Sequence, residues 1–270
     1  MGHGAVRFKR CCAATGAAWV WLALASLSGA QTPTVKSDAT WRTTATQPPD
    51  GWNTDIHFDD SDAAGWQNAF KSPSGDNIWY GSNHSDQSPN QAWFRYVFTL
   101  NQPIGNATGT FFFDDNGEAY INGRLIVADT TPGATTFLPT LDPTIFNVGS
   151  NLVAVHGIDT IPPFSNVAVD LFLLMPGDAN GDGAVNFNDL LTLAQHYGQT
   201  GRGWSDGDFT GEGTVVFADL LLLAQHYGQS LVAAPADAFV NASPQIVPEP
   251  SPALLALPLL LLGTNRRRHA

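Results

Sequence analysis

The sequence predicts an all-β sandwich followed by a small α-helical module built from two loop–helix units. Glycine (26 residues), proline (18) and aromatic side chains (11%) are plentiful in the 270-residue chain, which is typical of short strands joined by tight turns. Short apolar runs separated by turn-forming residues fill the segment 51–174. Residues 178–198 and 208–228 then repeat one another at an offset of 30.

The N-terminal segment, residues 1–30, has the three parts of a secretory signal peptide. Residues 7–10 carry positive charges, residues 17–27 are apolar, and residues 28–30 are small, as a cleavage site requires. Both cysteines lie in this segment, so removal by signal peptidase leaves a mature chain without cysteine. We therefore expect no disulfide bond, thiol catalysis or thiolate metal site.

The C-terminal segment begins with the motif Pro248-Glu249-Pro250, which precedes an apolar run (253–263) and a basic terminus (266–269). Over residues 248–270 this order resembles the PEP-CTERM sorting tail of exported bacterial proteins. The resemblance implies transient membrane contact through the tail and cleavage near the motif by an exosortase. The apolar run has 11 residues, fewer than the about 20 of a bilayer-spanning helix, so this tail alone is not expected to anchor the chain.

The chain is acidic, with a formal net charge of −12, and its central part is more acidic than the whole. Residues 31–250 hold all 24 acidic residues and only six of the 12 basic ones. Such a surface repels phosphate groups and attracts cations. We therefore expect no nucleic-acid partner.

Residues 31–175 are predicted to form the sandwich, because short apolar runs alternate with turns and no long helical period is present. Residues 31–50 are rich in threonine and proline and are predicted to be a lead-in or an edge strand. In the run 92–100, alternate side chains form one uniformly apolar face, as in a half-buried strand. The predicted strands are Thr54–Phe58, Asn77–Tyr80, Ala92–Leu100, Gly109–Phe113, Glu118–Ile121, Arg124–Ala128, Thr136–Leu138, Ile145–Val148, Asn151–Ile158 and Asn166–Leu174.

The turn sequence Asp114-Asp115-Asn116-Gly117 predicts a tight turn at one end of a hairpin, since asparagine and glycine tolerate positive φ angles. Together with Trp93-Phe94-Arg95-Tyr96, Tyr120-Ile121-Asn122-Gly123 and the run 149–155, it resembles the galactose-binding-like jelly roll found beside many glycoside hydrolases. The resemblance covers residues 51–174 and implies a jelly-roll sandwich. Members of that family bind sugars, lipids, other proteins or no known ligand.

The first loop, residues 178–189, has the spacing of a calcium-binding loop. Calcium prefers six to eight oxygen ligands, and a 12-residue loop supplies them from positions 1, 3, 5, 7, 9 and 12. Those positions hold Asp178, Asn180, Asp182, the backbone carbonyl of Ala184, Asn186 and Asp189. Glycine at position 6 permits the sharp turn that such a loop needs, so Ca²⁺ is the expected cofactor.

The second loop, residues 208–219, follows the same spacing less completely. Its candidate ligands are Asp208, Thr210, Glu212, the backbone carbonyl of Thr214 and Asp219. Thr210 is a neutral hydroxyl, and Val216 at position 9 offers no side-chain oxygen, so weaker binding is expected. A degenerate loop that is kept for packing is the alternative.

Loop followed by helix, twice, with aspartate at position 12, resembles a type I dockerin over residues 176–229. The resemblance implies a small calcium-folded module within residues 176–230, followed by a linker (231–247), that docks a cohesin-like protein. In that family, partner contact centres on loop positions 10 and 11, often a Ser-Thr pair. Here Phe187-Asn188 and Phe217-Ala218 occupy them. Alternatively, the two units pack only on each other or on the jelly roll.

The sequence shows no catalytic motif, and no catalytic residue is predicted. Its histidines have no recognisable partner spacing. The adjacent carboxylates of Asp59-Asp60 and Asp114-Asp115 point to opposite faces if they lie on a strand, so a turn or a structural calcium site explains them better than an acid–nucleophile pair.

Tryptophan rings that stack on sugars are the remaining candidate ligand contacts of the sandwich. Trp52 and Trp79 lie beside polar loop residues and are the weak candidates, whereas most of the other tryptophans are expected in the core.

These observations predict an exported, calcium-binding, non-enzymatic protein of the cell envelope or extracellular matrix, or one that is secreted. The sandwich is expected to bind a cell-surface glycan or another surface component, and the dockerin-like module to mediate attachment. Two alternatives stay open. One is a purely structural matrix protein whose calcium loops only stabilise the fold, and the other is an accessory or catalytic component of polysaccharide degradation.

Overall fold

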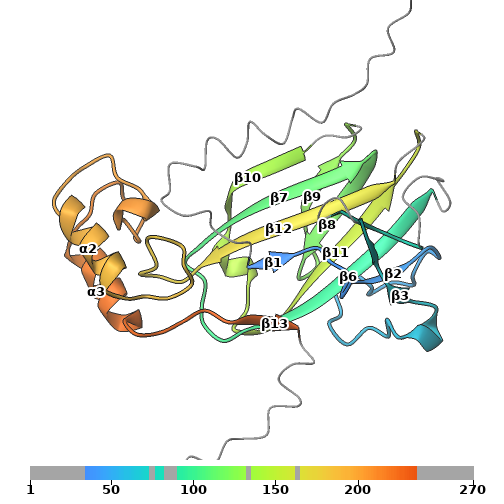
Figure 1. Ribbon diagram of the computed structural model, residues 1–270, viewed down its shortest axis with the longest axis horizontal. Coiled ribbons are helices and arrows are strands. Elements are labelled where there is room, and N and C mark those ends of the chain that lie inside the picture. Colours follow the sequence, from blue (N-terminus) through green and yellow to red (C-terminus); the bar gives the residue numbers. More distant parts are fainter. Residues whose placement is uncertain (1–33, 73–76, 82–89, 132–134, 162–164, 236–270) are drawn as a thin grey trace, which may run out of the picture. The chain divides into compact units, whose positions relative to one another are not determined.

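Two antiparallel β-sheets dominate the computed structural model, which describes residues 34–72, 77–81, 90–131, 135–161 and 165–235 (Figure 1). The predicted signal peptide and sorting tail lie outside these residues. In the first sheet the strand order is β10 (Thr135–Leu141), β7 (Asn106–Asp114), β12 (Asn166–Leu174), β5 (Ile78–Trp79) and β4 (Phe70–Lys71), and β1 (Val35–Lys36) also pairs with β12. In the second it is β3 (Gln67–Asn68), β2 (Arg42–Thr44), β6 (Gln91–Leu100), β11 (Gly149–Ile158), β8 (Asn116–Ile121) and β9 (Arg124–Asp129), and β13 (Ala233–Pro235) also pairs with β6.

The predicted sandwich is confirmed as two antiparallel sheets that share one hydrophobic core. Phe94 and Phe98 of β6 meet Phe111 and Phe113 of β7 in this core, and all four are fully buried. The alternation of apolar and polar residues along β7 matches its alternation of buried and half-buried positions. The predicted strands Ala92–Leu100 and Gly109–Phe113 are therefore present as β6 and β7, which begin one and three residues earlier, and β7 also ends one residue later.

Two of the predicted strands are wrong. Residues 54–58 form turns, because the Asp55 carboxylate accepts a hydrogen bond from the His57 backbone N–H at 2.8 Å and turns the chain. In the segment 145–148, a short 3₁₀ helix, η2 (Pro143–Ile145), replaces the expected strand start. Its N-cap Asp142 accepts a hydrogen bond from the Thr144 N–H at 3.0 Å, and proline at the first position favours a helical start.

Residues 92–95 of β6 are buried on both faces, which corrects the prediction of a half-buried strand for this part of it. Trp93 and Arg95 belong to the face opposite the core, yet they are 4% and 0% exposed. The segment 52–60 covers this face and is held to it by the Arg95 guanidinium. An arginine in an alternating strand signals a solvent-facing position only where no distant segment covers it.

The Arg95 side chain uses all of its nitrogens on that covering segment. Its Nε donates to Asp60 Oδ2 and its Nη2 donates to the Asp55 carbonyl, both at 2.9 Å, and its Nη1 donates to the Trp52 carbonyl. The Phe58 ring centroid lies 5.0 Å from the guanidinium carbon. One buried cation therefore holds the segment 52–60 against the outer face of the second sheet.

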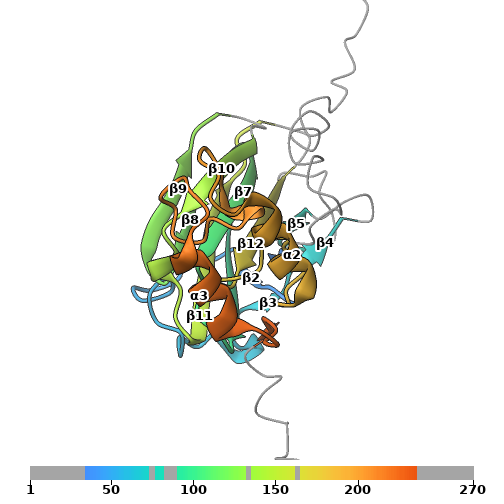
Figure 2. The ribbon, with the colours of Figure 1, turned by 90° about the vertical axis from the view of Figure 1, so that its left-hand side faces the viewer.

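Two helices, α2 (Phe187–His196) and α3 (Phe217–His226), lie side by side and follow the two predicted loops (Figure 2). A separate hydrophobic core joins them, and its buried members occur at equivalent places in the two repeats: Ala179 and Phe209, Val185 and Val215, and Leu193 and Leu223, with Met175 in addition. Glycine is required where the start of each repeat lies against the helix of the other repeat. A Cβ on Gly177 would lie 2.9 Å from Leu223 Cα, and one on Gly207 would lie 2.8 Å from Leu193 Cα.

The two cores lie within one unit of the chain and are joined by backbone and side-chain contacts. The strand β13 comes directly after the second repeat and pairs with β6 of the sandwich. Asn101 at the end of β6 accepts a hydrogen bond from the Val232 N–H at 2.7 Å and donates to the Ser230 carbonyl at 3.0 Å. None of the helices in the described ranges is both long and apolar enough to span a membrane.

Replacing Arg95 tests its role in holding the covering segment. We expect Arg95→Met to lower the free energy of unfolding by about 2–4 kcal/mol, because Asp60 and two carbonyls lose a buried donor. The measurement is urea unfolding followed by tryptophan fluorescence. The matched control is Arg124→Met, which breaks an exposed ion pair to Asp142 and is expected to change stability by less than about 0.5 kcal/mol. Equal effects of the two variants contradict the assignment.

Candidate calcium-binding site

The first loop is organised around the buried carboxylate of Asp178, which is 0% exposed. Its Oδ1 accepts a hydrogen bond from the Gly181 N–H at 2.7 Å, and its Oδ2 accepts one from the Gly183 N–H at 3.0 Å. Both glycines have positive φ angles, of 71° and 82°, which side-chain-bearing residues rarely adopt. The glycines therefore let the backbone curl around the carboxylate at position 1.

The oxygen-bearing groups at positions 3, 5, 7 and 9 converge within hydrogen-bond distance of one another. Asn180 Nδ2 lies 3.0 Å from Asp182 Oδ2, and Asn186 Nδ2 lies 3.5 Å from the same oxygen and 3.3 Å from the Ala184 carbonyl oxygen. A 180° rotation of either side-chain amide would place its oxygen, the atom that can bind calcium, where its nitrogen now lies. This part of the loop therefore gathers four of the six predicted donor groups.

The sixth predicted ligand, Asp189, connects the loop to the helix. It is fully buried at the third position of α2, where its Oδ2 accepts from the Asn186 N–H at 2.8 Å in a capping box. Its Oδ1 accepts from the N–H groups of Ala179 and Asn180, at 3.0 and 3.2 Å. One carboxylate thus ties the start of the loop to the start of the helix, where the helix dipole also favours negative charge.

The carboxylates of this loop stand together without a nearby cation. Burial raises the pKa of Asp178 to about 6, against the lowering effect of its backbone hydrogen bonds, and the charges of Asp189 and Asp182 raise it further. Burial likewise raises the pKa of Asp189. Among the described residues, no lysine, arginine or histidine forms an ion pair with these three carboxylates. A divalent cation would supply the missing positive charge.

The donor set fits calcium, which takes hard oxygen ligands in flexible geometry. In the part of the chain that the structure describes, no three His, Cys, Asp or Glu side chains are already gathered as a metal-binding group. In the first loop this follows from its chemistry. Half of the predicted donors are amide or carbonyl oxygens, and the carboxylates of Asp178 and Asp189 are turned toward backbone N–H groups.

The second loop repeats the hydrogen bonds of the buried aspartates at positions 1 and 12, but its side chains at the positions between them do not converge in the same way. Asp208 accepts from the N–H groups of Gly211 and Gly213, at 2.9 and 2.7 Å, and Asp219 accepts from the Thr210 N–H at 2.9 Å. The Thr210 hydroxyl also donates to Asp219, at 3.0 Å. Glu212 is exposed, and no described hydrogen bond joins its side chain to the other predicted ligands. In this loop the described hydrogen bonds therefore join the Thr210 side chain to Asp208 and Asp219 and leave out the side chain of Glu212.

Backbone pairing couples each loop to the end of the opposite repeat. Ala184 at position 7 of the first loop forms an antiparallel bridge with Ser230, and Thr214 at position 7 of the second loop forms one with Thr200. Both residues at position 7 are predicted to offer their carbonyls to calcium. Each loop is therefore held against the chain that follows the helix of the other repeat.

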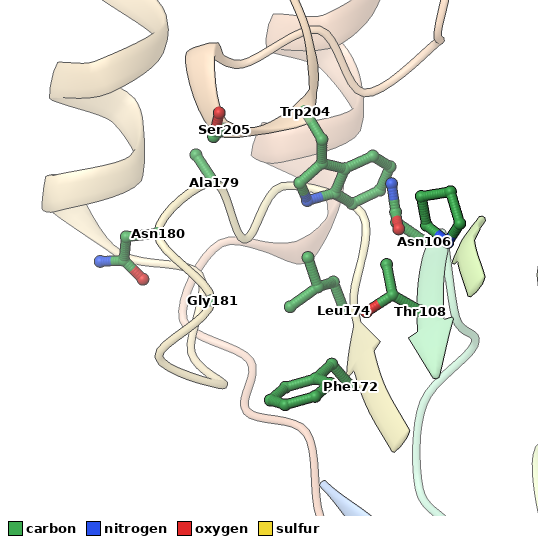
Figure 3. A pocket seen from close by; sticks show the side chains of 10 residues that line it. Asn106, Thr108, Phe172, Leu174, Ala179, Asn180, Gly181, Trp204 and Ser205 are labelled. Atoms are coloured by element: carbon green, nitrogen blue, oxygen red, sulfur yellow. The ribbon is translucent and has the colours of Figure 1, made fainter. Parts of the chain in front are cut away.

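The tryptophan Trp204 contacts the first loop and was not foreseen as a site residue. Its Nε1 donates to the Asp178 carbonyl at 2.7 Å, and a Cβ on Gly105 would lie 2.5 Å from its ring. Trp204 lines a pocket of about 210 Å³ together with Phe172 and Leu174 from β12. Figure 3 shows these three side chains around it. In the sequence, this contact could have been suspected only from the presence of one tryptophan in the polar, glycine-rich segment 199–207.

The two tryptophans that were candidate sugar contacts have different surroundings. Trp79 is 1% exposed and packs against Phe94 at 5.7 Å between ring centroids, so it belongs to the core and its rings are not available for stacking on a ligand. Trp52 is half-buried and meets Tyr120 edge-on at 5.9 Å. Of the two candidates, only Trp52 remains accessible.

No protein-family model and no curated protein matches the chain. Among solved structures, a type II cohesin-dockerin domain from Bacteroides cellolosolvens is similar over 22% of this chain and 93% of its own, with 34% identity and a TM-score of 0.20. A glycosyl hydrolase family 2 member from Bacteroides cellulosilyticus is similar over 51% of this chain and 20% of its own, with 13% identity and a TM-score of 0.34. For the β-glucuronidase of Bacteroides uniformis the shares are 51% and 18%, with 12% identity and a TM-score of 0.34. The chain spans about a fifth of the length of these two glycosidases.

Calcium is expected to stabilise the full chain, and the first loop should account for most of the effect. A ligand that binds only the folded state adds about 2.7 kcal/mol when its concentration is roughly 100 times its Kd. We expect Asp178→Asn to remove more of the calcium-induced increase in Tm than Asp208→Asn does, because the first loop has the fuller donor set. Circular dichroism melts in calcium and in chelator measure this, with the exposed Asp62→Asn as control. A calcium-induced increase in Tm that is as large in the Asp178/Asp208 double variant as in the wild type rules out the loops.

The raised pKa of Asp178 predicts how the calcium-free protein responds to pH. Its pKa is about 6 in the folded state and 3.8 ordinarily, so between these values the folded chain holds a proton that the unfolded chain has lost. The contribution of Asp178 to stability is therefore present below about pH 4 and is lost as the pH rises through about 6. Urea unfolding of calcium-depleted protein across this range should show that slope in the wild type and a flatter one in Asp178→Asn. Parallel profiles would refute the assignment.

Proposed function

We propose that this chain is an exported calcium-binding protein whose loop–helix pair attaches it to a cohesin-like partner. The observation that carries the proposal is the convergence of the oxygen groups of the first loop around Asp178 and Asp182, in a module with only seven buried core side chains. So small a core supplies little folding energy, and calcium binding adds what is missing. The predicted signal peptide and sorting tail support a location where calcium is abundant.

The surface that would meet the partner is apolar and occurs twice. Phe187 and Phe217, at position 10 of the two loops, are 62% and 66% exposed. Leu191 and Leu221 follow four residues later, so each lies on the same helix face as its phenylalanine, and they are 45% and 47% exposed. Exposed apolar patches of this kind mark interaction sites. Their position matches the loop positions that contact the partner in type I dockerins, which the sequence resembles.

The repeat predicts that either helix can present the docking surface. Each patch has the same phenylalanine and leucine, which lie two residues before and two residues after the capping aspartate of the same loop, Asp189 or Asp219. Because the loop fixes the first turn of the helix, calcium binding and docking are expected to depend on one another. A purely structural role for the module predicts calcium-dependent stability without any partner.

The sandwich has one accessible aromatic candidate for glycan binding, and this supports a second role for the chain. Trp52 meets Tyr120, whose hydroxyl donates to Glu118 at 2.6 Å. A half-buried ring beside a phenol and a carboxylate offers both stacking and hydrogen bonding to a sugar. Such binding would let the sandwich hold a surface glycan while the loop–helix pair holds a protein.

Docking is tested with the full chain and a panel of purified type I and type II cohesins, measured by calorimetry in calcium and in chelator. We expect calcium-dependent binding that survives in Phe187→Ser or Phe217→Ser alone, because the other repeat remains, and that is lost in the double variant. Leu125→Ser, at an exposed leucine of the sandwich (51%), is the control and should bind as the wild type does. Absence of binding to any cohesin, with the calcium-induced stabilisation intact, would favour the purely structural alternative.

A further inference from the structure

The pocket beside Trp204 has a floor made by two neighbouring strands of the first sheet. Along β12 the core residues alternate with Phe172 and Leu174, so these two side chains point to the outer face of the sheet. In the register of β12 with β7, Phe172 lies opposite Thr108, and Leu174 lies opposite Asn106. The floor therefore places two apolar side chains next to two polar ones.

The rest of the pocket comes mainly from the loop–helix pair. Trp204 and the segment 179–181 of the first loop line it as well. Figure 3 shows Trp204 and Phe172 on opposite sides of the pocket, with Leu174 between them. The cavity of about 210 Å³ thus lies where the sandwich and the helical module meet, and such junctions are a common place for ligand pockets.

The indole ring of Trp204 is fixed in place without being fully buried. Its Nε1 donates to the Asp178 carbonyl at 2.7 Å, and Phe209 packs edge-on against it at 5.1 Å between ring centroids. The residue is half-buried, and it borders a second hollow of about 340 Å³ that also reaches Asn106. A ring that is already held in one position loses little entropy when a ligand stacks on it.

The polar side chains of the pocket have unused hydrogen-bonding capacity. Within the described ranges, the side chains of Asn106, Thr108 and Ser205 form no hydrogen bond to another protein group. Asn106 and Thr108 are half-buried on the floor. An amide and a hydroxyl group each donate and accept hydrogen bonds, so this floor can pair with the hydroxyl groups of a ligand.

The charges around the pocket favour a neutral ligand. Among the described residues that line it, none has a charged side chain, so neither an anion nor a cation finds an ion-pair partner in its wall. Asp178 and Asp182 flank the lining segment 179–181, and their carboxylates repel an approaching anion. A neutral molecule with an apolar face and a rim of hydroxyl groups matches the lining, and a sugar ring is such a molecule.

We propose that this pocket binds a neutral saccharide, with one sugar ring stacked on Trp204 and hydrogen-bonded to Asn106 and Thr108. The C–H face of the sugar packs on the indole, and its hydroxyl groups meet the amide and hydroxyl of the floor. The second hollow shares Trp204 and Asn106 with this pocket and gives space for a neighbouring unit of the same saccharide. The site is separate from the Trp52 face of the sandwich and requires no cohesin-like partner.

Calorimetric titration of the full chain with neutral cello-, xylo- and manno-oligosaccharides tests the site. We expect saturable binding of at least one of them, and about tenfold weaker binding in Asn106→Ala and in Thr108→Val, because each variant loses a hydrogen bond to the sugar and none within the protein. Thr110→Val, on the same face of β7 but outside the pocket, is the matched control and should bind as the wild type does. Failure of all three saccharides to bind overturns the proposal.

Tryptophan variants decide where the saccharide lies. Trp204→Ala should abolish binding, Trp204→Phe should keep a weaker form of it because an aromatic face remains, and Trp52→Ala should bind as the wild type does. If Trp204→Ala does not fold, the Asn106 and Thr108 variants decide the question. Binding that is lost in Trp52→Ala and unchanged in Asn106→Ala and Thr108→Val places the sugar on the sandwich face and overturns the pocket. None of these outcomes depends on whether a cohesin binds.

Discussion

The burial of several carboxylates with a single buried cation is the constraint on which much of this structure depends. Among the described residues, six aspartates are buried, Asp115, Asp159, Asp178, Asp189, Asp208 and Asp219, whereas Arg95 is the one buried cationic side chain. A buried carboxylate must find hydrogen-bond donors, and here these are mostly backbone N–H groups. Backbone donors converge on one point only where the chain turns sharply. The glycine-rich loops and the connections between the sheets are therefore the places where these acids lie.

In the loop–helix pair this constraint links folding to the two exposed apolar patches. Asp189 accepts N–H groups from the start of the first loop and from the residue that caps α2. Phe187 stands in the first turn of that helix and is mostly exposed. A cation held by the loop would relieve the repulsion around Asp178 and fix this first turn. The repeat places Asp219 and Phe217 in the same relation on α3, so the module contains this arrangement of buried aspartate and exposed phenylalanine twice.

The sandwich and the helical pair are joined by contacts whose residues the sequence pattern does not identify. Trp204 donates to the carbonyl of Asp178 and fills the space above Gly105, while β13 continues from the second repeat onto β6. The first loop is thus held from the side of the sandwich as well as by its own helix. At the end of the sandwich, Asn101 binds the chain that follows the second repeat, and Gly105 lies against the ring of Trp204.

The sequence by itself determined what depends on neighbours along the chain. The 12-residue spacing, the glycines between the acids and the period of each helix lie within one short segment, so the loops around Asp178 and Asp208 and the long strands β6, β7, β11 and β12 could all be predicted. Only the tertiary structure decided which distant segments became neighbours. It buried Arg95 beneath residues 52–60, placed Trp79 in the core, and brought Asp159 to Asp114 and Asp115 across two sheet crossings. These outcomes rest on strand pairing between residues tens of positions apart, and no local pattern of polarity encodes which strands will meet.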